Sequence, residues 1–220
     1  MCGRYTLGVA SDELVEAFDV PPPAFEWSPR YNVAPGQDCP VVARDRKGTR
    51  MGLLRWGLVP GWMDDPPSGG FVNARAESAG EKPSFKEAWA RRRCLVPVDG
   101  FYEWGTPGEE DDEDRESVPY WFRRPNGSLF TLAGLWEGTT FAVLTTEANP
   151  DVAPVHHRMP VLVASWNRHR WLDAATPPEE VTELAATPEG GILQAWPVSR
   201  AVNDPANDHP GLVDRTGPSP

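Results

Sequence analysis

The sequence predicts an α+β fold in which a strand-rich core carries a few short helices. Short apolar stretches bounded by turn residues outnumber the helical stretches, and the helices fall between them irregularly rather than in regular alternation. The 220 residues show no internal repeat and suffice to bury a core without disulfides. We therefore expect a single domain over residues 2–203, followed by a flexible tail at 204–220 that is rich in Pro, Asp and Gly.

Three helices are predicted from their capping residues. Ser11 precedes two acidic residues and a set of apolar residues at helical spacing, so it is the expected cap of the first helix. Ser84 and Glu87 form a capping box for a second helix that runs to about residue 92. Thr176 and Glu179 repeat the pattern, with proline at the first helical position, for a third helix that runs to about residue 186.

Seven strands are predicted from runs of apolar, β-branched and aromatic residues. They cover residues 41–44, 51–56, 94–98, 120–124, 129–136, 141–146 and 159–163. The turn residues at 125–128 (PNGS) stand between two of these runs, and this arrangement is typical of a β-hairpin.

The net charge of −11 is unfavourable for a nucleic-acid-binding protein, because phosphate contacts normally come from an excess of Lys and Arg. The run at 109–116 (EEDDEDRE) accounts for −6 of this charge. We interpret it as a solvated acidic loop inserted into the domain. The rest of the chain keeps every arginine except Arg115, which leaves enough cations for one basic groove.

Cysteine usage and hydropathy indicate the compartment. Cys2, Cys39 and Cys94 form no CxxC pair and are odd in number, which argues for a reducing compartment and against a disulfide framework or a thiolate zinc site. The sequence contains neither a signal-peptide apolar region nor an apolar run of membrane length. We expect a soluble, cytoplasmic monomer with no membrane contact, no metal site and no cofactor.

A cysteine directly after the initiator methionine is the most informative local feature. Removal of Met1 would leave Cys2 with an α-amine and a thiol on adjacent carbons, and both groups have reference pKa values within reach of neutral pH. Such a 1,2-aminothiol condenses with an aldehyde, first to an imine and then, by thiolate attack on the imine carbon, to a five-membered thiazolidine. The second attack is intramolecular and therefore gains effective concentration.

Six ordered sequence blocks accompany Cys2: MCGRY at 1–5, RWGLVPGW at 55–62, NARAE at 73–77, CLVPVDGFYEW at 94–104, HHRMP at 156–160 and PVSRAVN at 197–203. Together they resemble the SOS-response-associated peptidase family, the abasic-site-processing proteins, from residue 2 to about residue 203. The resemblance implies a strongly curved, barrel-like mixed or antiparallel β core. It also implies a sensor of abasic sites in single-stranded DNA that crosslinks its N-terminal cysteine to the ring-opened sugar, which shields the lesion during the DNA damage response.

Catalytic roles can be assigned within these blocks and at one threonine outside them. Cys2 is the nucleophile, and Glu103 is the general acid or base, because burial among aromatic residues would raise its pKa towards neutrality. His156 matches the family's His-x-Arg-x-Pro pattern and is chosen as the proton shuttle over His157, which should face the opposite way on an extended segment. Asn73 would orient the sugar or the α-amine, and a hydroxyl near the aldehyde is assigned to Thr145.

DNA-binding candidates follow from phosphate and base chemistry. Guanidinium groups bind phosphates, and aromatic faces stack under bases. Arginines beside the catalytic blocks, two tryptophans next to glycine or catalytic residues, and one proline in a cleft-lining loop are therefore expected to contact single-stranded DNA: Arg4, Arg75, Arg158, Trp62, Trp104 and Pro35. Arg4 has a structural ion pair as its alternative role.

Three functions from different classes remain open at this point. The first is covalent capture of abasic sites, which is enzyme-like Schiff-base chemistry related to that of lyases. The second is a cysteine peptidase, which would act on the chain's own N-terminus or use an internal thiol such as Cys94. The third is a non-covalent single-stranded DNA-binding module in which Cys2 is incidental.

Overall fold

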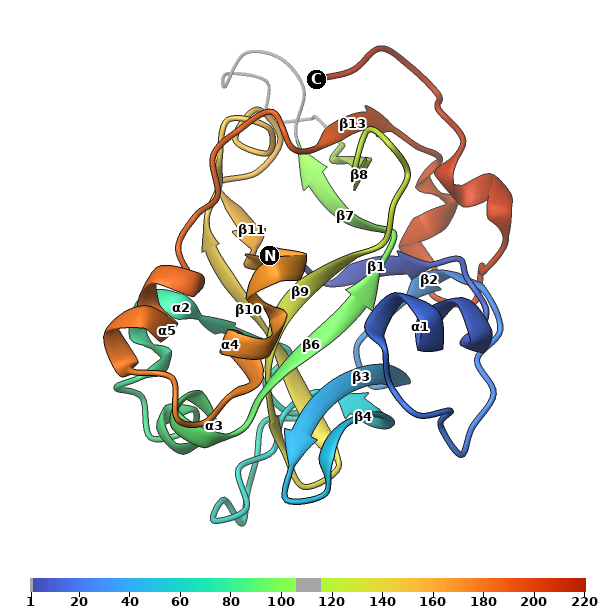
Figure 1. Cartoon of the computed structure of the whole chain (residues 1–220). Coiled ribbons are helices and arrows are strands. Elements are labelled where there is room, and N and C mark those ends of the chain that lie inside the picture. The colour runs from blue at the N-terminus through green and yellow to red at the C-terminus, as the bar shows by residue number, and fades with distance from the viewer. Residues whose placement is uncertain (1, 106–115) are drawn as a thin grey trace.

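The computed structural model describes residues 2–105 and 116–220, and most of the acidic run at 109–116 lies outside the described residues. One sheet is wholly antiparallel, with the strand order β13-β8-β7-β1-β2. Its strands are β1 (Arg4–Leu7), β2 (Arg30–Val33), β7 (Gly100–Gly105), β8 (Val118–Arg123) and β13 (Gln194–Pro197). We call it sheet A, and it occupies the upper part of the view in Figure 1.

The second sheet, sheet B, follows the order β11-β10-β4-β3-β6-β9-β12, with β5 also paired to β10. Because β10 pairs with β9 as well as with β4, the sheet curls into a ring of strands, although it is not closed as a barrel. Its strands are β3 (Asp38–Asp45), β4 (Gly48–Trp56), β5 (Asn73–Arg75), β6 (Arg93–Val98), β9 (Phe130–Glu137), β10 (Thr140–Glu147), β11 (Arg158–Pro160) and β12 (Leu162–Val163). The predicted α+β class and curved core are confirmed.

The main hydrophobic core joins the two sheets. Tyr5 of sheet A packs against Trp56 of sheet B with ring centroids 5.2 Å apart. Phe101 of sheet A meets Phe130 of sheet B edge to face at 6.5 Å. All four rings are fully or almost fully buried. Burial of aromatic rings of this size dominates core energetics, so this contact fixes how the sheets meet.

Short helices flank the sheets among the described residues. They are α1 (Ser11–Phe18), α2 (Ala76–Ala79), α3 (Lys86–Arg91), α4 (Arg168–Leu172) and α5 (Pro178–Leu184), with 3-10 turns η1 (Ser165–Asn167), η2 (Arg200–Asn203) and η3 (Pro210–Val213). Figure 1 shows α2 to α5 gathered on one side and α1 on the other. The three predicted helices are present, with proline at the start of the last one.

The predicted side-chain caps of these helices are wrong. None of α1, α3 and α5 begins with a capping hydrogen bond from a side chain. The Ser11 hydroxyl oxygen instead accepts the backbone N–H of Trp27, and Thr176 donates its hydroxyl to Arg170 O. Both hydroxyls hold neighbouring segments together rather than the helix start, and a local capping pattern does not distinguish these uses.

Every predicted strand lies within or close to an observed one, but the predicted hairpin at 125–128 is wrong. A turn is present, since Gly127 has a φ of +72° and donates to Arg124 O. The strands on either side do not pair with each other, because β8 joins β7 and β13 whereas β9 joins β6, β10 and β12. The turn therefore carries the chain from one sheet to the other.

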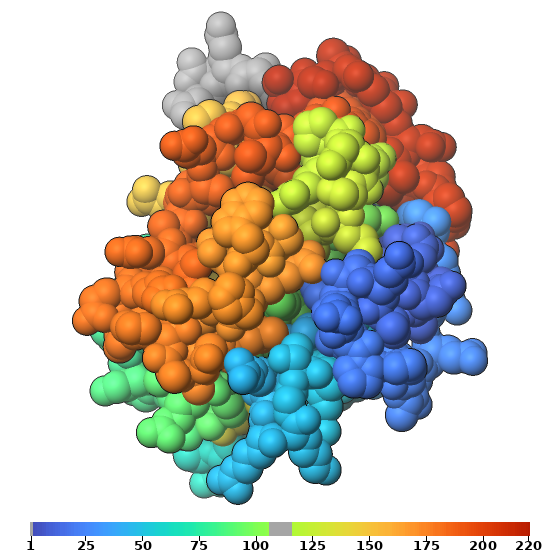
Figure 2. All heavy atoms as spheres, viewed as in Figure 1, coloured from blue at the N-terminus to red at the C-terminus, as the bar shows by residue number. Residues whose placement is uncertain are grey.

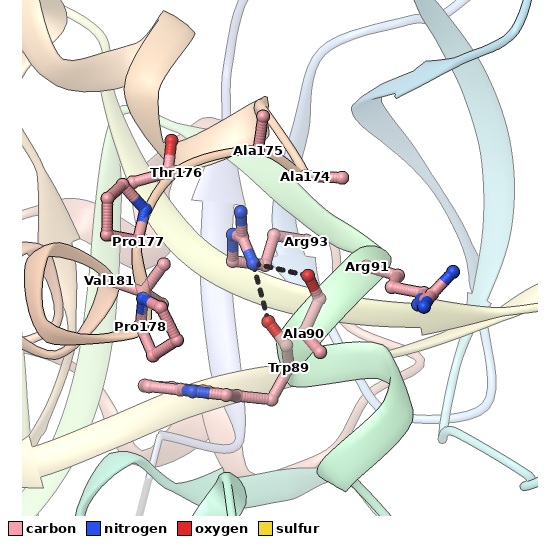
Figure 3. Close-up of a pocket in the computed structure, with 10 residues that line it drawn as sticks. All are labelled: Trp89, Ala90, Arg91, Arg93, Ala174, Ala175, Thr176, Pro177, Pro178 and Val181. Atoms are coloured by element: carbon pink, nitrogen blue, oxygen red, sulfur yellow. Dashed lines mark hydrogen bonds between the residues drawn. The ribbon is translucent and has the colours of Figure 1, made fainter.

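Arg93 ties α3 and α4 to sheet B. Its buried guanidinium donates to Trp89 O and Ala90 O at the end of α3, and to Trp171 O and Asp173 O at the end of α4. Figure 3 shows this side chain between α3 and the loop at 174–178, beside a pocket of about 620 Å³. A cation is favourable at the negative end of a helix dipole, so Arg93 stabilises two helix ends at once.

The segment at 204–220 follows the surface of the domain, whereas its composition predicted a flexible tail. Asp208 pairs with Arg30 and accepts the backbone N–H of Tyr31. Leu212 is fully buried in a second apolar cluster with Tyr102 and Trp121. Figure 2 shows the segment in red along the upper right edge, down to the blue residues near the N-terminus.

Candidate active site

The N-terminal segment enters the structure beside the strand that carries Glu103. Strand β1 pairs with β7 so that Arg4 lies opposite Tyr102, which brings Cys2 close to Glu103. Both side chains are buried, with 0% of Cys2 and 1% of Glu103 exposed. Burial raises the pKa of the Cys2 thiol well above its ordinary value, and the Glu103 charge raises it further. The resting thiol is therefore protonated and needs a base nearby to react.

Burial also raises the pKa of Glu103, from its ordinary value of 4.5 to about 7. The physical cause is the loss of hydration of the carboxylate, which disfavours the charged form. A carboxyl group with a pKa of about 7 gives and accepts protons with similar ease at neutral pH.

Sheet B supplies the opposite wall of the site. Strands β5 and β10 run parallel, with Asn73 opposite Val143 and Arg75 opposite Thr145. The Asn73 Nδ2 group donates to the backbone carbonyl of Cys2 at 2.9 Å, so it holds the N-terminal residue directly. Among the described residues, the buried Asn73 Oδ1 atom accepts no hydrogen bond. This acceptor is therefore available to a donor on a bound substrate.

His156 lies at the end of the loop between β10 and β11, facing Glu103. Its Nδ1 atom is 4.0 Å from Glu103 Oε2 and 2.9 Å from both the backbone N and the backbone O of Arg158. Burial lowers the pKa of His156, so the ring is neutral at pH 7. A neutral imidazole has one N–H donor and one nitrogen acceptor, and the contacts at Nδ1 with Arg158 fix the orientation of the ring.

The prediction that His157 faces away from His156 is wrong. The two rings stack with centroids 4.5 Å apart, because this part of the chain is a turn rather than an extended strand. His157 is the exposed ring of the pair, and His156 is the one that meets Glu103. Among the residues that the structure describes, no three His, Cys, Asp or Glu side chains form a group suited to a metal ion.

Arg158 links the site to α2. Its guanidinium makes two hydrogen bonds to the Glu77 carboxylate, at 2.7 and 2.9 Å, and a third to the backbone carbonyl of Thr145 at 2.8 Å. These bonds lower the pKa of Glu77 below its ordinary value. Sequence reasoning missed Glu77, although it follows Arg75 by two residues in the same block. Thr145 is fully buried, and its hydroxyl lies 3.4 Å from Arg158 Nη2.

Arg75 is exposed and makes no ion pair within 4 Å among the described residues. It lines a shallow pocket of about 570 Å³ together with Glu147, His157 and Arg158. This pocket is lined partly by Ala153 and His157 of the loop that carries His156, so its charged rim lies next to His156.

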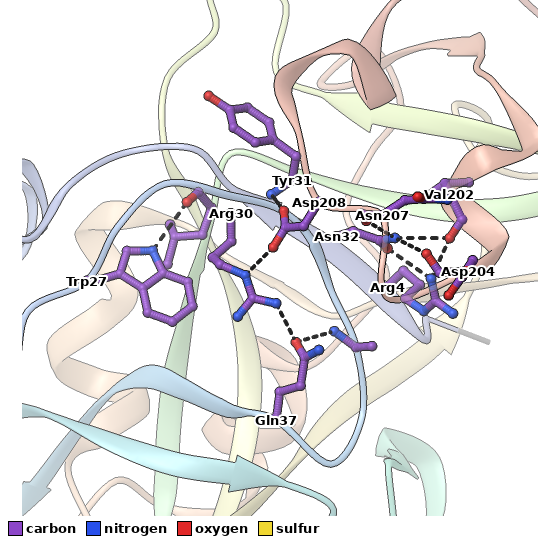
Figure 4. Close-up of polar contacts among 12 residues, drawn as sticks. Arg4, Trp27, Arg30, Tyr31, Asn32, Gln37, Val202, Asp204, Asn207 and Asp208 are labelled. Atoms are coloured by element: carbon purple, nitrogen blue, oxygen red, sulfur yellow. Dashed lines mark hydrogen bonds and ion pairs between the residues drawn. The ribbon is translucent and has the colours of Figure 1, made fainter.

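The structure places Arg4 and Trp104 against the C-terminal part of the chain. Arg4 donates to Asn32 Oδ1 at 2.9 Å and to the backbone carbonyls of Val202 and Asn203. Trp104 Nε1 donates to Asn203 Oδ1 at 2.8 Å. Figure 4 shows how the buried Asn32 amide joins this network by donating to three backbone carbonyls at 202–207. The block at 197–203 therefore contacts the N-terminal strand.

Two other predicted DNA contacts lie on exposed loops. Trp62 has 59% of its side chain exposed, on a loop closed at its base by the bridge between Leu58 and Phe71. Pro35 is exposed on the turn that follows β2. Within the described part of the chain, neither residue makes a hydrogen bond or ring contact with Cys2, Glu103 or His156.

Fold and site together define an α+β protein in which Cys2 lies beside the buried Glu103 carboxyl and the partly buried His156 imidazole at the junction of two sheets. This arrangement has relatives of known sequence. The family model for SOS response associated peptidases matches residues 1–205, so the chain belongs to this family. The resemblance found in the six sequence blocks is thereby confirmed.

Individual relatives cover almost the whole chain. Abasic site processing protein YoqW of Bacillus subtilis is 35% identical over 97% of this chain and 99% of its own length. Abasic site processing protein YedK of Escherichia coli is 27% identical over 97% and 99% of the two chains. Abasic site processing protein HMCES of Gallus gallus is 31% identical, over 84% of this chain and 65% of its own.

Solved structures share the fold. A protein from Bacteroides thetaiotaomicron has a TM-score of 0.82 at 21% identity and covers 98% of this chain and 100% of its own. A phage-related protein from Bordetella bronchiseptica has a TM-score of 0.71 at 26% identity over 90% and 95% of the two chains. Among the described residues, no helix is both long and apolar enough to cross a bilayer.

Proposed function

We propose that this protein processes abasic sites in single-stranded DNA by forming a covalent thiazolidine with Cys2 after removal of Met1. The observation that carries the proposal is the meeting of the Cys2 segment with a buried Glu103 whose pKa is about 7 and with a neutral His156. The names of relatives that cover 97% of the chain, all abasic site processing proteins, support the substrate class.

The reaction needs three proton movements. The Cys2 amine adds to the sugar aldehyde, a proton moves from its nitrogen to the oxygen to give the carbinolamine, and the carbinolamine then loses water to give the protonated imine. Protonated Glu103 donates the proton that lets hydroxide leave, and its carboxylate then takes the proton of the Cys2 thiol. The thiolate attacks the carbon of the protonated imine, whose nitrogen keeps its hydrogen, and the net products are a thiazolidine and one water. His156 is suited to the initial ring opening of the sugar, because a neutral imidazole offers one proton donor and one proton acceptor near neutral pH.

DNA contacts come from the rim of the site. Arg75 is exposed and makes no ion pair in the described part of the chain, so it is the first candidate for the phosphate beside the lesion. Arg158 would bind a phosphate only in exchange for the half-exposed Glu77 carboxylate. Trp62 offers an exposed ring for base stacking. Arg4, Trp104 and Pro35 stay in the proposal as flanking contacts.

Intact mass measurement tests the covalent chemistry. The purified protein should lack Met1, and incubation with an oligonucleotide containing one abasic site should add the oligonucleotide mass less one water. Cys2→Ser keeps the amine but not the thiol, so it should form only an imine. This adduct should be detected only when borohydride reduces the imine to a stable amine. A stable adduct of Cys2→Ser without borohydride would exclude the thiazolidine. A variant with an uncleaved N-terminal tag is the matched control and should form no stable adduct.

A peptidase activity on the chain's own N-terminus is the second candidate, favoured by the description of the family. It would use the same Cys2 and Glu103 and would end with the loss of Met1. A peptidase built on Cys94 is not supported, because burial alone raises the pKa of this thiol and, in contrast to Cys2, no charged group of the described residues contributes to it. Retention of Met1 in Glu103→Gln, but not in wild type, when both are made without methionine aminopeptidase would favour the self-processing activity.

A further inference from the structure

The loop between β10 and β11 carries His156, and its first turn begins at Asn149, whose backbone carbonyl accepts the N–H groups of Val152 and Ala153 at 3.0 and 2.9 Å. Asn149 is 1% exposed, and its Oδ1 atom accepts the backbone N–H groups of Asp151 and Val152 at 3.2 and 3.3 Å. Its Nδ2 group donates to Glu189 O at 3.1 Å. Asn149 thus occupies the position of an N-terminal cap for the turns that follow, and it also joins this loop to a second one.

The hydrogen bonds continue from this cap to the imidazole. Val152, which is fully buried, accepts at its carbonyl the backbone N–H groups of Val155 and His156 at 2.9 and 3.0 Å. The ends of the loop are joined by the bond from Ala148 N to His157 O at 3.1 Å. The orientation of the His156 backbone therefore depends on the turn that Asn149 starts.

A carboxylate fixes the outer side of the same loop. Asp151 accepts three successive backbone N–H groups, those of Gly191, Ile192 and Leu193, at 2.7, 3.0 and 3.0 Å. Asn149 and Asp151, both in the first turn of the loop, thus attach the His156 loop to the chain at 189–193. The attachment lies outside the catalytic cluster and contributes no group to the chemistry.

The strand of Glu103 approaches this loop closely on its other side. A Cβ atom on Gly105 would lie 2.9 Å from Val155 O and 3.2 Å from Val155 Cα, closer than a side chain allows. Gly105 is two residues after Glu103 on β7, and Val155 directly precedes His156. The absence of a side chain at Gly105 therefore permits the 4.0 Å separation between Glu103 Oε2 and His156 Nδ1.

From this geometry we propose that Asn149 is a positioning residue that holds the His156 imidazole against Glu103. The inference rests on the proposed function, because its consequence is a slower proton transfer at that site. Displacement of a reacting group by about 1 Å reduces rates by about 100-fold. Loss of the Asn149 cap can therefore slow the reaction strongly even where it changes the free energy of unfolding little. Asn149 touches neither Cys2 nor His156 directly and acts through the Val152 carbonyl.

The test compares Asn149→Ala with Asn126→Ala. Asn126 is the matched control, because its Oδ1 also accepts the N–H two residues later, in the turn that links β8 to β9. For each variant we would measure the rate of adduct formation with abasic DNA, the affinity for an intact single strand and the titration of His156 by NMR. The charged or titratable groups that face His156 in the described structure, Glu103, His157 and Arg158, are unchanged in both.

Asn149→Ala should form the adduct about 10- to 100-fold more slowly at unchanged affinity, whereas Asn126→Ala should match wild type. The His156 titration should move up towards the ordinary imidazole value, because the ring regains water. Asn149→Ser keeps a capping oxygen and should recover most of the rate. A wild-type rate and titration in folded Asn149→Ala would overturn the proposal.

Two further measurements distinguish failure of this proposal from unfolding of the variant and from failure of the proposed function. If Asn149→Ala does not fold, Gly105→Ala tests the same contact from the β7 side and should shift the His156 titration in the same direction; an unshifted titration would contradict the proposal. If wild type forms no adduct at all, the proposed function fails, while the NMR titrations of the variants still decide whether Asn149 positions His156.

Discussion

Replacing Glu103 by Gln should change how the stability of the protein depends on pH. The pKa of this carboxyl is raised by burial from 4.5 to about 7, so the folded state holds the proton more tightly than the unfolded state does. Glu103 therefore contributes stability at low pH that is lost as the pH rises from about 4.5 through 7. Glutamine has the same shape and does not titrate, so the variant lacks this loss.

The size of the effect follows from the shift. At about 1.4 kcal/mol per pKa unit, a rise from 4.5 to about 7 corresponds to about 3 kcal/mol in total, of which roughly 2–3 kcal/mol falls between pH 5 and pH 8. The unfolding free energy of Glu103→Gln minus that of wild type should increase by this amount over the same interval. His156, whose pKa is lowered by burial, changes stability in the opposite direction but is present in both proteins.

Urea unfolding of both proteins at pH 5, 6, 7 and 8 measures this difference directly. A difference that stays constant with pH would refute the reasoning, since Glu103 would then titrate alike in the folded and unfolded states. A difference that decreases with pH would mean that the folded structure stabilises the carboxylate and not the acid. The same variant should form the adduct about 10²- to 10⁴-fold more slowly at unchanged affinity for an unreactive strand, and an equal fall in both would make Glu103 structural.

Three other predictions concern the rim, the core and the acidic run. Arg75→Ala should weaken binding of single-stranded DNA and flatten its salt dependence, and wild-type affinity at low salt would contradict the phosphate contact. Cys94→Ala should lower the free energy of unfolding by about 1 kcal/mol, because the buried thiol packs closely. Adduct formation should be unchanged in the mass assay, and loss of the adduct would indicate that Cys94 takes part in the reaction. Deletion of 109–116 should leave the melting temperature and the adduct intact, since the run has no apolar residue to pack, and a melted domain would show that a structural element was removed.

The fold class and most strands were predictable because they depend on local patterns. Runs such as 94–98 and 141–146 are apolar along their whole length, and the observed strands β6 and β10 cover them. Five strands were missed: β1, β2, β5, β7 and β13. All except β7 have only three or four residues, which give too little periodicity to recognise. Of the five, β1 and β5 bring Cys2 and Asn73 together and β7 carries Glu103, so the strands that form the site were the ones missed.

The chemistry of the candidate residues was predictable from their types, but their arrangement was not. A desolvated carboxyl at Glu103 follows from its aromatic neighbours, and the structure raises its pKa to about 7. The stacked histidines, by contrast, depend on the turn that Asn149 starts, which the local sequence does not show. The pairing of Arg158 with Glu77 joins residues 81 positions apart.

By itself the sequence determined which groups this protein possesses: a cysteine behind the initiator methionine, a carboxyl among aromatic residues and a histidine in a family pattern. Only the tertiary structure decided that β8 and β9 belong to different sheets and that the two sheets meet at Cys2, Glu103 and His156. The physical reason is range. Propensity and turn chemistry act over a few residues, whereas the burial that shifts these pKa values is created by strands that are distant in sequence and packed together.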